Sequence, residues 1–504
     1  MFCNTMMGQT HIGADPFYLL QVEKKQFQGK LPNQSNTFRP IFFITDSIAS
    51  SIRFRAENYF NNNNPNQENM DVRYFSKGYG NFHSIQLSLN SPYFSFIAEP
   101  YIRSGNFYKT NNVKRPGPFS VLNDITLTRE QTSSTFRNLL AFIHYKGIGF
   151  GLHHGNRWWG PGLHTSLQMT NNTFPFPAQI IGTLQELRIG NIGIYGLYTF
   201  AQLDDYDDFR AKYFTSLSGQ LTWYGPIILS LGFNRSYLSG GSKLSSGYEW
   251  KEKDARSVVF EGVFTSNLVK KEYTNIRGGD PWDQTLAGYL SITLPESNAK
   301  LFAEFGFNDN RMFFADLLSQ PDHTLATIIG FRDYGIGNLK NWVYGFEWAN
   351  LLLTYTIRHR GIDGTPAWYQ RSIYNYSTYE GRRWAAHSGA DSDDWYLFAG
   401  YLSKNFMFIP AINYERHGVV SYRPAEVKIE LRLDMRYRYN DIWFGAYFER
   451  QYEAFLGFPD YFYVDELNNP VDASDGPLAR TRLTNTFILS ISKKINFNIY
   501  DLTE

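Results

Sequence analysis

Two adjacent tryptophans, Trp158 and Trp159, lie in the stretch of this sequence with the most distinctive chemistry. They belong to the run RWWGPG at positions 157–162, whose glycines and proline disfavour a regular helix or a central strand. Two asparagines, Asn171 and Asn172, follow at a turn-like position. Flat aromatic rings beside planar guanidinium and amide donors are suited to recognising glycosyl rings. A tight corner whose tryptophans pack against neighbours or anchor at a membrane interface would use the same residues, so both interpretations stay open.

A second cationic and aromatic group lies far along the chain, at Arg382, Arg383 and Trp384. A guanidinium fork can hold a uronate carboxylate while an indole ring stacks on a sugar face. A solvated loop with an incidental basic pair is the alternative. The residues that we predict to bind polysaccharide are Arg157, Trp158, Trp159, Asn171, Asn172, Arg382, Arg383 and Trp384.

Charged and apolar residues alternate strictly between positions 427 and 438. The apolar face comprises Val427, Ile429, Leu431, Leu433, Met435 and Tyr437. We predict that the charged residues opposite them line an aqueous lumen, namely Lys428, Glu430, Arg432, Asp434 and Arg436. The cations could form a polysaccharide groove together with Arg438, but the interspersed carboxylates favour a ladder of ion pairs.

Acidic clusters are candidates for a calcium site. One comprises Asp204, Asp205, Asp207 and Asp208, and a weaker one comprises Asp391, Asp393 and Asp394. Ca²⁺ takes about six to eight oxygen ligands, but neither cluster has the order or the glycine of an EF-hand. We therefore predict no metal site and no cofactor.

Catalysis has a single conceivable pair in this sequence, Ser166 with His154. The two residues are close only in sequence, and the chain has no GxSxG element and no HExxH spacing. We therefore predict no catalytic residue and no enzymatic activity.

The composition is that of a membrane β-barrel. Aromatic residues make up 17% and charged residues 19% of the 504 residues, the latter below the roughly 25% of a soluble domain. The mean hydropathy is −0.38, and no apolar run approaches the ~18 residues of a transmembrane helix. Barrels combine these properties because only alternate residues face lipid. The net charge of +1 does not suggest nucleic-acid binding, and the single cysteine, Cys3, allows no internal disulfide.

Turn lengths support a large closed antiparallel transmembrane β-barrel. Short turns are expected at 190–191, 224–225, 403–405 and 439–440, and long loops at 238–256, 309–324, 359–393, 416–425 and 453–480. Dividing the chain by about 25 residues per strand and connection gives about 16–18 strands. From about position 300 onwards, short and long connections alternate regularly along the chain. This alternation places the C-terminus in the periplasm. It fails between 257 and 299, which leaves open whether a further strand pair lies there.

We expect two parts in the chain. Residues 1–40 would form an N-terminal segment, periplasmic or plug-forming, with a short helix at 17–27, and residues 41–504 would form the barrel with its long external loops. Met1 to Gly8 lack the basic start and apolar core of a secretory signal, so we predict that they are the tail of a signal that begins upstream. Mass spectrometry of the mature protein tests this, since a chain beginning at Met1 would contradict it.

The RWWGPG run, followed by Ser-Leu, Asn-Asn and Pro-Phe-Pro up to position 177, resembles the signature of the capsule assembly (Wzi) family. Positions 379–393 are similar to that family's Gly-aromatic-His-Gly-x-Asp segment, although Trp384 replaces a smaller apolar residue and Ala386 a glycine. Proteins of this family are outer-membrane β-barrels of about eighteen strands, described as lectins that hold capsular polysaccharide. Positions 149–177 carry the firmest part of the resemblance.

The resemblance implies a lectin in the outer membrane of a Gram-negative bacterium. It would bind capsular or exopolysaccharide and assist its attachment or assembly at the cell surface, as a monomer surrounded by outer-membrane lipid. Composition alone also fits a porin-like diffusion channel for oligosaccharides or small solutes, or an envelope scaffold whose loops bind another protein. Glycan binding would separate the lectin from both alternatives.

Overall fold

Strand β23 (Glu426–Tyr439) shows why this sequence forms a barrel. Its apolar residues point outward, and Leu431 is 52% exposed. The preceding residue, Glu430, points inward and is 0% exposed. Because successive side chains of a strand point to opposite faces, an apolar face and a charged face suit a wall with a polar interior.

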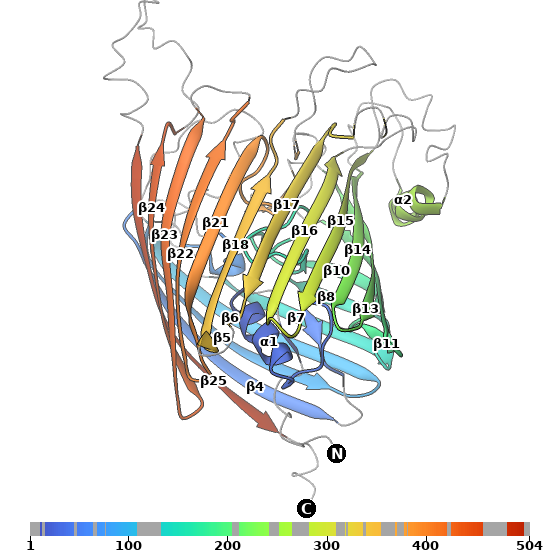
Figure 1. Ribbon diagram of the computed structural model, residues 1–504, viewed down its shortest axis with the longest axis horizontal. Helices are drawn as coiled ribbons and strands as arrows, with labels where there is room; N and C mark the ends of the chain where they lie inside the picture. The colour runs from blue at the N-terminus through green and yellow to red at the C-terminus, as the bar shows by residue number, and fades with distance from the viewer. Residues whose placement is uncertain are drawn as a thin grey trace, which may run out of the picture.

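The computed structural model describes residues 11–12, 16–44, 48–63, 68–75, 77–107, 133–203, 211–240, 251–264, 282–308, 318, 321–335, 339–353, 368–369, 377–380, 382–420, 425–456 and 481–497. Within these residues, eighteen antiparallel strands close into a barrel (Figure 1), as the sequence predicts. Short β11 counts with β10, because both pair with β12. Closure joins β25 to β4, with Thr486 opposite Asn61 and Phe497 opposite Ser50.

The other wall strands are β4 (Ala49–Asn61), β5 (Gly78–Asn90), β6 (Phe94–Phe107), β7 (Ser133–Tyr145), β8 (Ile148–Gly155), β10 (Phe176–Thr183), β11 (Leu187–Ile189), β12 (Ile192–Gln202), β13 (Tyr213–Tyr224), β14 (Ile228–Ser239), β15 (Trp282–Leu294), β16 (Ala299–Asn308), β17 (Leu325–Asp333), β18 (Trp342–Asn350), β21 (Ser392–Leu402), β22 (Phe406–His417), β24 (Ile442–Ala454) and β25 (Arg482–Phe497). Neighbouring strands of the wall pair antiparallel around the barrel. The lumen holds shorter pairs, β2 (Phe38–Arg39) with β9 (Trp158–Trp159) and β19 (Thr378–Tyr379) with β20 (Arg382–Arg383), and β1 (His11–Ile12) pairs with β3 (Ile41–Phe42).

The barrel has a short-turn end and a long-connection end. The four short turns predicted from the sequence all lie at the short-turn end, together with the start of β4 and the end of β25. The open question at 257–299 is resolved, because β14 pairs directly with β15 from Ile228 to Ser239 and leaves no place for a further strand pair between them. Instead, one long connection joins the two strands and contains helix α2 (Glu252–Phe264).

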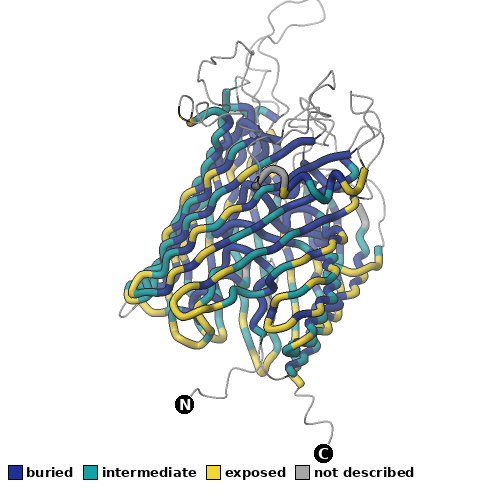
Figure 2. The backbone as a smooth tube through the Cα atoms, turned by 90° about the vertical axis from the view of Figure 1, so that its right-hand side faces the viewer, coloured by how far each residue is buried: buried dark blue, intermediate teal, exposed yellow. Residues whose placement is uncertain are grey.

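Exposed aromatic residues lie on the outer surface towards both ends of the barrel, around the wall at one end and on the strands from β21 to β5 at the other. Those at the short-turn end are Tyr93, Tyr145, Trp223, Trp342 and Tyr439, and those towards the long-connection end are Tyr79, Trp395, Tyr414 and Tyr452. Figure 2 shows the intervening wall, where exposed and buried positions alternate along the strands. Exposed Leu, Ile and Phe residues occupy the outward positions between these two groups.

The N-terminal helix, α1 (Pro16–Phe27), lies in the lumen at the short-turn end, and its position confirms the helix predicted at 17–27. Its buried Glu23 accepts hydrogen bonds from Lys300 Nζ at 2.9 Å, Arg332 Nε at 2.8 Å and Tyr334 Oη at 2.6 Å. Burial opposes the charged form, but Arg332 and Lys300 outweigh it and hold the pKa of Glu23 well below its usual range. Among the helices described, none is long and apolar enough to cross a membrane.

Candidate functional site

The RWWGPG run folds inward from the end of β8 and crosses the lumen. Trp158 and Trp159 form β9, which pairs with Arg39 and Phe38 of β2. The guanidinium of Arg39 lies 4.4 Å from the ring centroid of Trp158 and donates hydrogen bonds to the carbonyl oxygens of the two glycines that follow. The tryptophans are thereby held inside the barrel.

Glutamates of the barrel wall bind the backbone of this run. Glu347 Oε2 accepts a hydrogen bond from the amide of His164 at 2.8 Å, and Glu304 Oε1 accepts one from the amide of Leu167 at 2.8 Å. A side chain at Gly160 would meet Glu304 Oε2 at 2.7 Å, and Gly160 has a φ of 150°, which favours glycine. Glycine is therefore required here by the close approach of the loop to a wall carboxylate.

The two groups of predicted sugar-binding residues contact each other, although they lie far apart in the sequence. Asn172 Nδ2 donates to the carbonyl oxygen of Arg383 at 2.8 Å, and Arg382 Nε donates to the carbonyl oxygen of Asn172 at 3.1 Å. The rings of Trp159 and Trp384 both contact Phe214 of β13, at centroid distances of 6.0 and 5.1 Å. Together these residues form an apolar core with a hydrogen-bonded rim inside the lumen.

All eight predicted sugar-binding residues are at most 3% exposed in this conformation. Burial lowers the pKa of the Arg157 guanidinium to about 9. Among the described residues, the buried polar atoms without a hydrogen-bond partner include Arg157 Nε, Trp158 Nε1 and both amide atoms of Asn171. Such atoms are rare in folded proteins and need water or a ligand. The sugar-binding role of the eight residues stays a prediction.

The charged residues of β23 meet in ion pairs on the inner face of the barrel. Arg436 Nε lies 3.1 Å from Asp434 Oδ1, Lys428 Nζ lies 3.5 Å from Glu430 Oε1, and Arg432 also contacts Glu430. This geometry corresponds to the ladder of ion pairs, since each cation has a carboxylate beside it.

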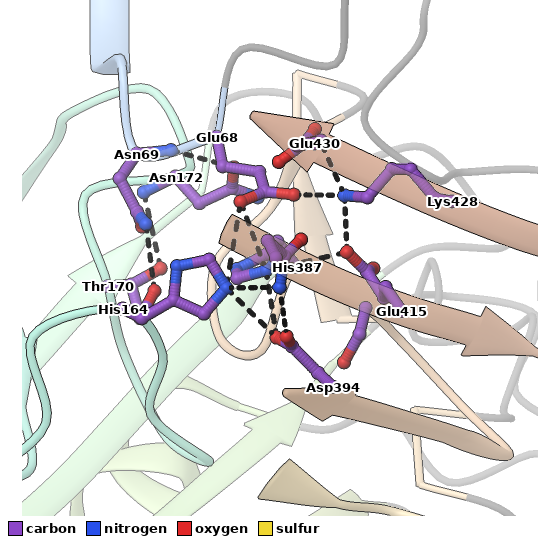
Figure 3. A network of polar contacts seen from close by, with 12 residues as sticks. Glu68, Asn69, His164, Thr170, Asn172, His387, Asp394, Glu415, Lys428 and Glu430 are labelled. Carbon is purple, nitrogen blue, oxygen red and sulfur yellow. Dashed lines mark hydrogen bonds and ion pairs between the residues drawn. The ribbon is translucent and has the colours of Figure 1, made fainter. Parts of the chain in front are cut away.

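A buried polar network joins this ladder to the inward loops (Figure 3). We call it the Glu68 network, and it comprises Glu68, His164, His387, Asp394, Glu415, Lys428, Glu430, Arg432 and Glu449. Burial opposes ionisation of Glu68, but Arg432, His387 and Lys428 outweigh it and hold the pKa of Glu68 well below its usual range. Burial likewise disfavours a charged His164, but Asp394 and Glu68 outweigh it and raise the pKa of His164.

Sequence reasoning did not single out the histidines of this network. His164 lies two residues after the end of RWWGPG, and His387 lies in the second segment that resembles the Wzi family, so both belong to stretches that the sequence already marks as distinctive. Of the weaker acidic cluster, Asp394 belongs to the network, whereas Asp393 pairs with Arg416 and Asp391 accepts hydrogen bonds from backbone amides. The acidic cluster at 204–208 lies outside the described residues.

The conceivable catalytic pair is not assembled. Ser166 is buried in the lumen, where its hydroxyl donates to Glu304 Oε1 at 3.1 Å. His154 belongs to the wall strand β8, and its Nε2 lies 2.9 Å from the carbonyl oxygen of Phe136. Neither residue contacts the other in the hydrogen bonds of the described part of the chain.

A wide cavity opens at the short-turn end of the lumen, with a volume of about 1330 Å³. It is lined by the cationic residues Lys24, Lys25, Lys30, Arg53, Lys404, Arg438, Lys493 and Lys494, and by the acidic residue Asp441. We call it the basic cavity. Its charge is opposite to the excess of carboxylates in the Glu68 network.

No family model matches the sequence, and no curated protein matches it significantly. Among solved structures, OpdQ and OprD of Pseudomonas aeruginosa align with 90% of this chain and with 100% and 95% of theirs, at 10% and 9% identity. Their TM-scores of 0.44 and 0.42 are too low to support an argument. Wzi, an outer-membrane protein involved in group 1 capsule assembly in Escherichia coli and described as a carbohydrate-binding β-barrel, aligns with a TM-score of 0.59 at 11% identity, over 96% of this chain and 99% of that chain. The predicted likeness to Wzi and its closed barrel is therefore confirmed for the fold.

Proposed function

We propose that this protein is a monomeric outer-membrane lectin that binds surface polysaccharide and helps to retain or assemble it. Binding would occur in the long-connection half of the lumen, without covalent change to the glycan. The observation that carries the proposal is the meeting of the RWWGPG run with Arg382, Arg383 and Trp384 inside a barrel of Wzi-like fold. Wzi itself is described as binding carbohydrate.

The outer surface supports a place in the outer membrane. Exposed aromatic residues towards both ends, separated by an apolar wall, suit the two interfaces and the hydrocarbon core of a bilayer, because amphipathic rings settle at the level of the headgroups. Short turns at one end and long connections at the other follow the usual periplasmic and external arrangement. The C-terminal end of β25 would then face the periplasm.

The contacts across the lumen favour holding a ligand over conducting one. The loop after β8 is hydrogen-bonded to Glu304, Arg332 and Glu347 of three wall strands. Its other side bonds to Arg39 and, through Asn172, to Arg383. A diffusion channel would need this bridge to move aside.

The buried polar atoms without partners indicate how a glycan would be held. Trp158 Nε1 and the amide of Asn171 can donate to sugar hydroxyls, and the Asn171 oxygen can accept from them. Both residues are buried in this conformation, so a glycan would reach them only after a local movement of the segments packed against them.

Glycan-array binding with the purified full-length protein tests the proposal. We expect binding to at least one surface polysaccharide, and about a tenfold loss in Trp158→Phe and Asn171→Ala, which each remove hydrogen-bonding atoms. Trp223→Phe, on the outer surface, is the matched control and should bind normally. Heat-modifiable mobility in gels confirms that each variant is a folded barrel.

Conductance in planar bilayers separates the lectin from the channel. The lectin predicts a silent barrel, because the loop after β8 crosses the lumen. A steady open pore together with no binding on the array would refute the proposal and favour the channel.

A further inference from the structure

Four side chains from four separate segments converge within the Glu68 network (Figure 3). His387 Nε2 lies 3.1 Å from Asp394 Oδ2 and 3.2 Å from Glu68 Oε2. His164 Nε2 lies 3.2 Å from the same Asp394 oxygen and 3.9 Å from the same Glu68 oxygen. His387 is shared by two groups of potential metal ligands, one with Glu68 and His164 and the other with Asp394 and Glu415, and within each group the ligand atoms lie within 4.8 Å of one another.

Well-directed hydrogen bonds do not satisfy every atom in this arrangement. Within the described residues, Nε2 of His387 and Oδ2 of Asp394 have no hydrogen-bond partner, although they lie at hydrogen-bond distance from each other. Both side chains are at most 1% exposed. A buried ring nitrogen that lies at nearly the same distance from two acidic oxygens can serve as a metal ligand together with them.

The charge of the Glu68 network also favours a bound cation. Glu68, Asp394, Glu415, Glu430 and Glu449 supply carboxylates, whereas Lys428 and Arg432 are its only permanently cationic members. A buried excess of negative charge is costly without a compensating cation. A divalent ion at the convergence point would supply two positive charges.

We propose that Glu68, His164, His387 and Asp394 bind a divalent transition-metal ion of the Zn²⁺ type. Tetrahedral Zn²⁺ with nitrogen and oxygen ligands at about 2.0–2.2 Å places ligand atoms about 3.3–3.6 Å apart. The four histidine–carboxylate separations, 3.1, 3.2, 3.2 and 3.9 Å, each lie within a few tenths of an ångström of this range. The two imidazoles favour such an ion over Ca²⁺ or Mg²⁺, which prefer oxygen ligands.

The position of the ligands gives the ion a structural role. Glu68 belongs to the connection between β4 and β5, His164 to the loop after β8, His387 to the segment after β20, and Asp394 to the wall strand β21. One ion would therefore crosslink three inward segments to the barrel wall. A cavity of about 180 Å³, lined in part by Glu68, His164 and Arg436, adjoins the site and offers a path for entry.

Metal analysis of the folded full-length protein tests the inference. After stripping with a chelator and dialysis against Zn²⁺, we expect about one zinc ion per chain and a higher unfolding temperature than in the stripped protein. Replacement by Co²⁺ should give the visible absorption of a tetrahedral nitrogen and oxygen site. A folded wild-type barrel that takes up no stoichiometric metal would overturn the inference.

Variants place the ion at this site. His387→Gln and Asp394→Asn should each lower zinc affinity about 100-fold or more while the barrel still shows heat-modifiable mobility. His144→Gln is the matched control, because His144 is also buried but bonds to Ser95 on another part of the wall. Zinc retained equally by His387→Gln and His144→Gln would show that the ion binds elsewhere and would contradict the assignment.

Discussion

The two ends of the lumen differ in the sign of their charges and in their access to water. The Glu68 network, towards the long-connection end, places more carboxylates than cations in a dry interior where each charge contacts a partner. The basic cavity, at the short-turn end, places cations around a wide space. Close pairing is needed in the first because desolvation is costly, whereas water screens like charges in the second. The same number of charges should therefore matter far more at one end than at the other.

The largest expected effect is at Glu68. Glu68→Gln leaves Lys428 and Arg432 short of a buried partner, so the free energy of unfolding in chelator should fall by about 3–5 kcal/mol. Lys25→Gln in the basic cavity should change it by less than about 1 kcal/mol. Denaturant unfolding in detergent, followed by tryptophan fluorescence, measures both. Equal losses would remove the contrast between the two ends.

Glu23 provides an intermediate case, because it is a buried carboxylate close to the basic cavity. Glu23→Gln should lower the free energy of unfolding by about 2–3 kcal/mol and increase hydrogen exchange in α1. Its depressed pKa means that this contribution is fully present above the ordinary pKa of a glutamate and is lost only in acid. Unchanged exchange in α1 would show that apolar contacts alone dock the helix.

The dependence of stability on salt concentration should also differ between the two ends, by less than the effects of Glu68→Gln and Glu23→Gln. Raising ionic strength screens repulsion in the basic cavity but barely reaches the dry Glu68 network. The stability difference between wild type and a Lys404→Gln/Lys493→Gln variant should therefore shrink by about 0.5–1 kcal/mol between low and high salt. The difference between wild type and Glu68→Gln serves as the control and should stay constant. A salt response of the control as large as that of the cavity variant would indicate that water reaches both regions.

A further prediction concerns the pH dependence of Lys24. Burial, and then the charge of Lys30, lower the pKa of Lys24 to about 8. Below pH 8 both the folded and unfolded states carry the charge, so its cost is fully present. As the pH rises above 8 the folded state releases the proton first, and the wild type should gain stability relative to Lys24→Met. Unfolding midpoints at pH 7 and 10 measure this gain, and a constant difference would contradict it.

Much of the wall could be predicted from the sequence, because the direction of each side chain in a strand depends only on its neighbours in the chain. Whether Leu431 faces out and Glu430 faces in follows from their adjacent positions, and the predicted helix at 17–27 and the short turns needed only local patterns as well. The uncertainty at 257–299 arose because a helix-containing connection breaks the rhythm of hairpins.

The interior could be predicted only in part. RWWGPG and the segment around Arg382 were recognisable as motifs, but nothing local indicates that Asn172 bonds to Arg383 or that both lie inside the barrel. The Glu68 network was missed for the same reason, since His164 and His387 acquire their partners only when two distant loops fold into one lumen. Such sites depend on loop paths, for which a single sequence has no periodic signal.

The wall glutamates that hold Gly160 and its neighbours impose an order on biogenesis. Glu304, Arg332 and Glu347 stand on three adjacent strands that follow the tryptophan pair by well over a hundred residues in the chain. The interior loop cannot reach its final position until those strands have been laid side by side. The wall strands must therefore pair before the interior loop can form its hydrogen bonds, so closure of this part of the barrel precedes the filling of its lumen.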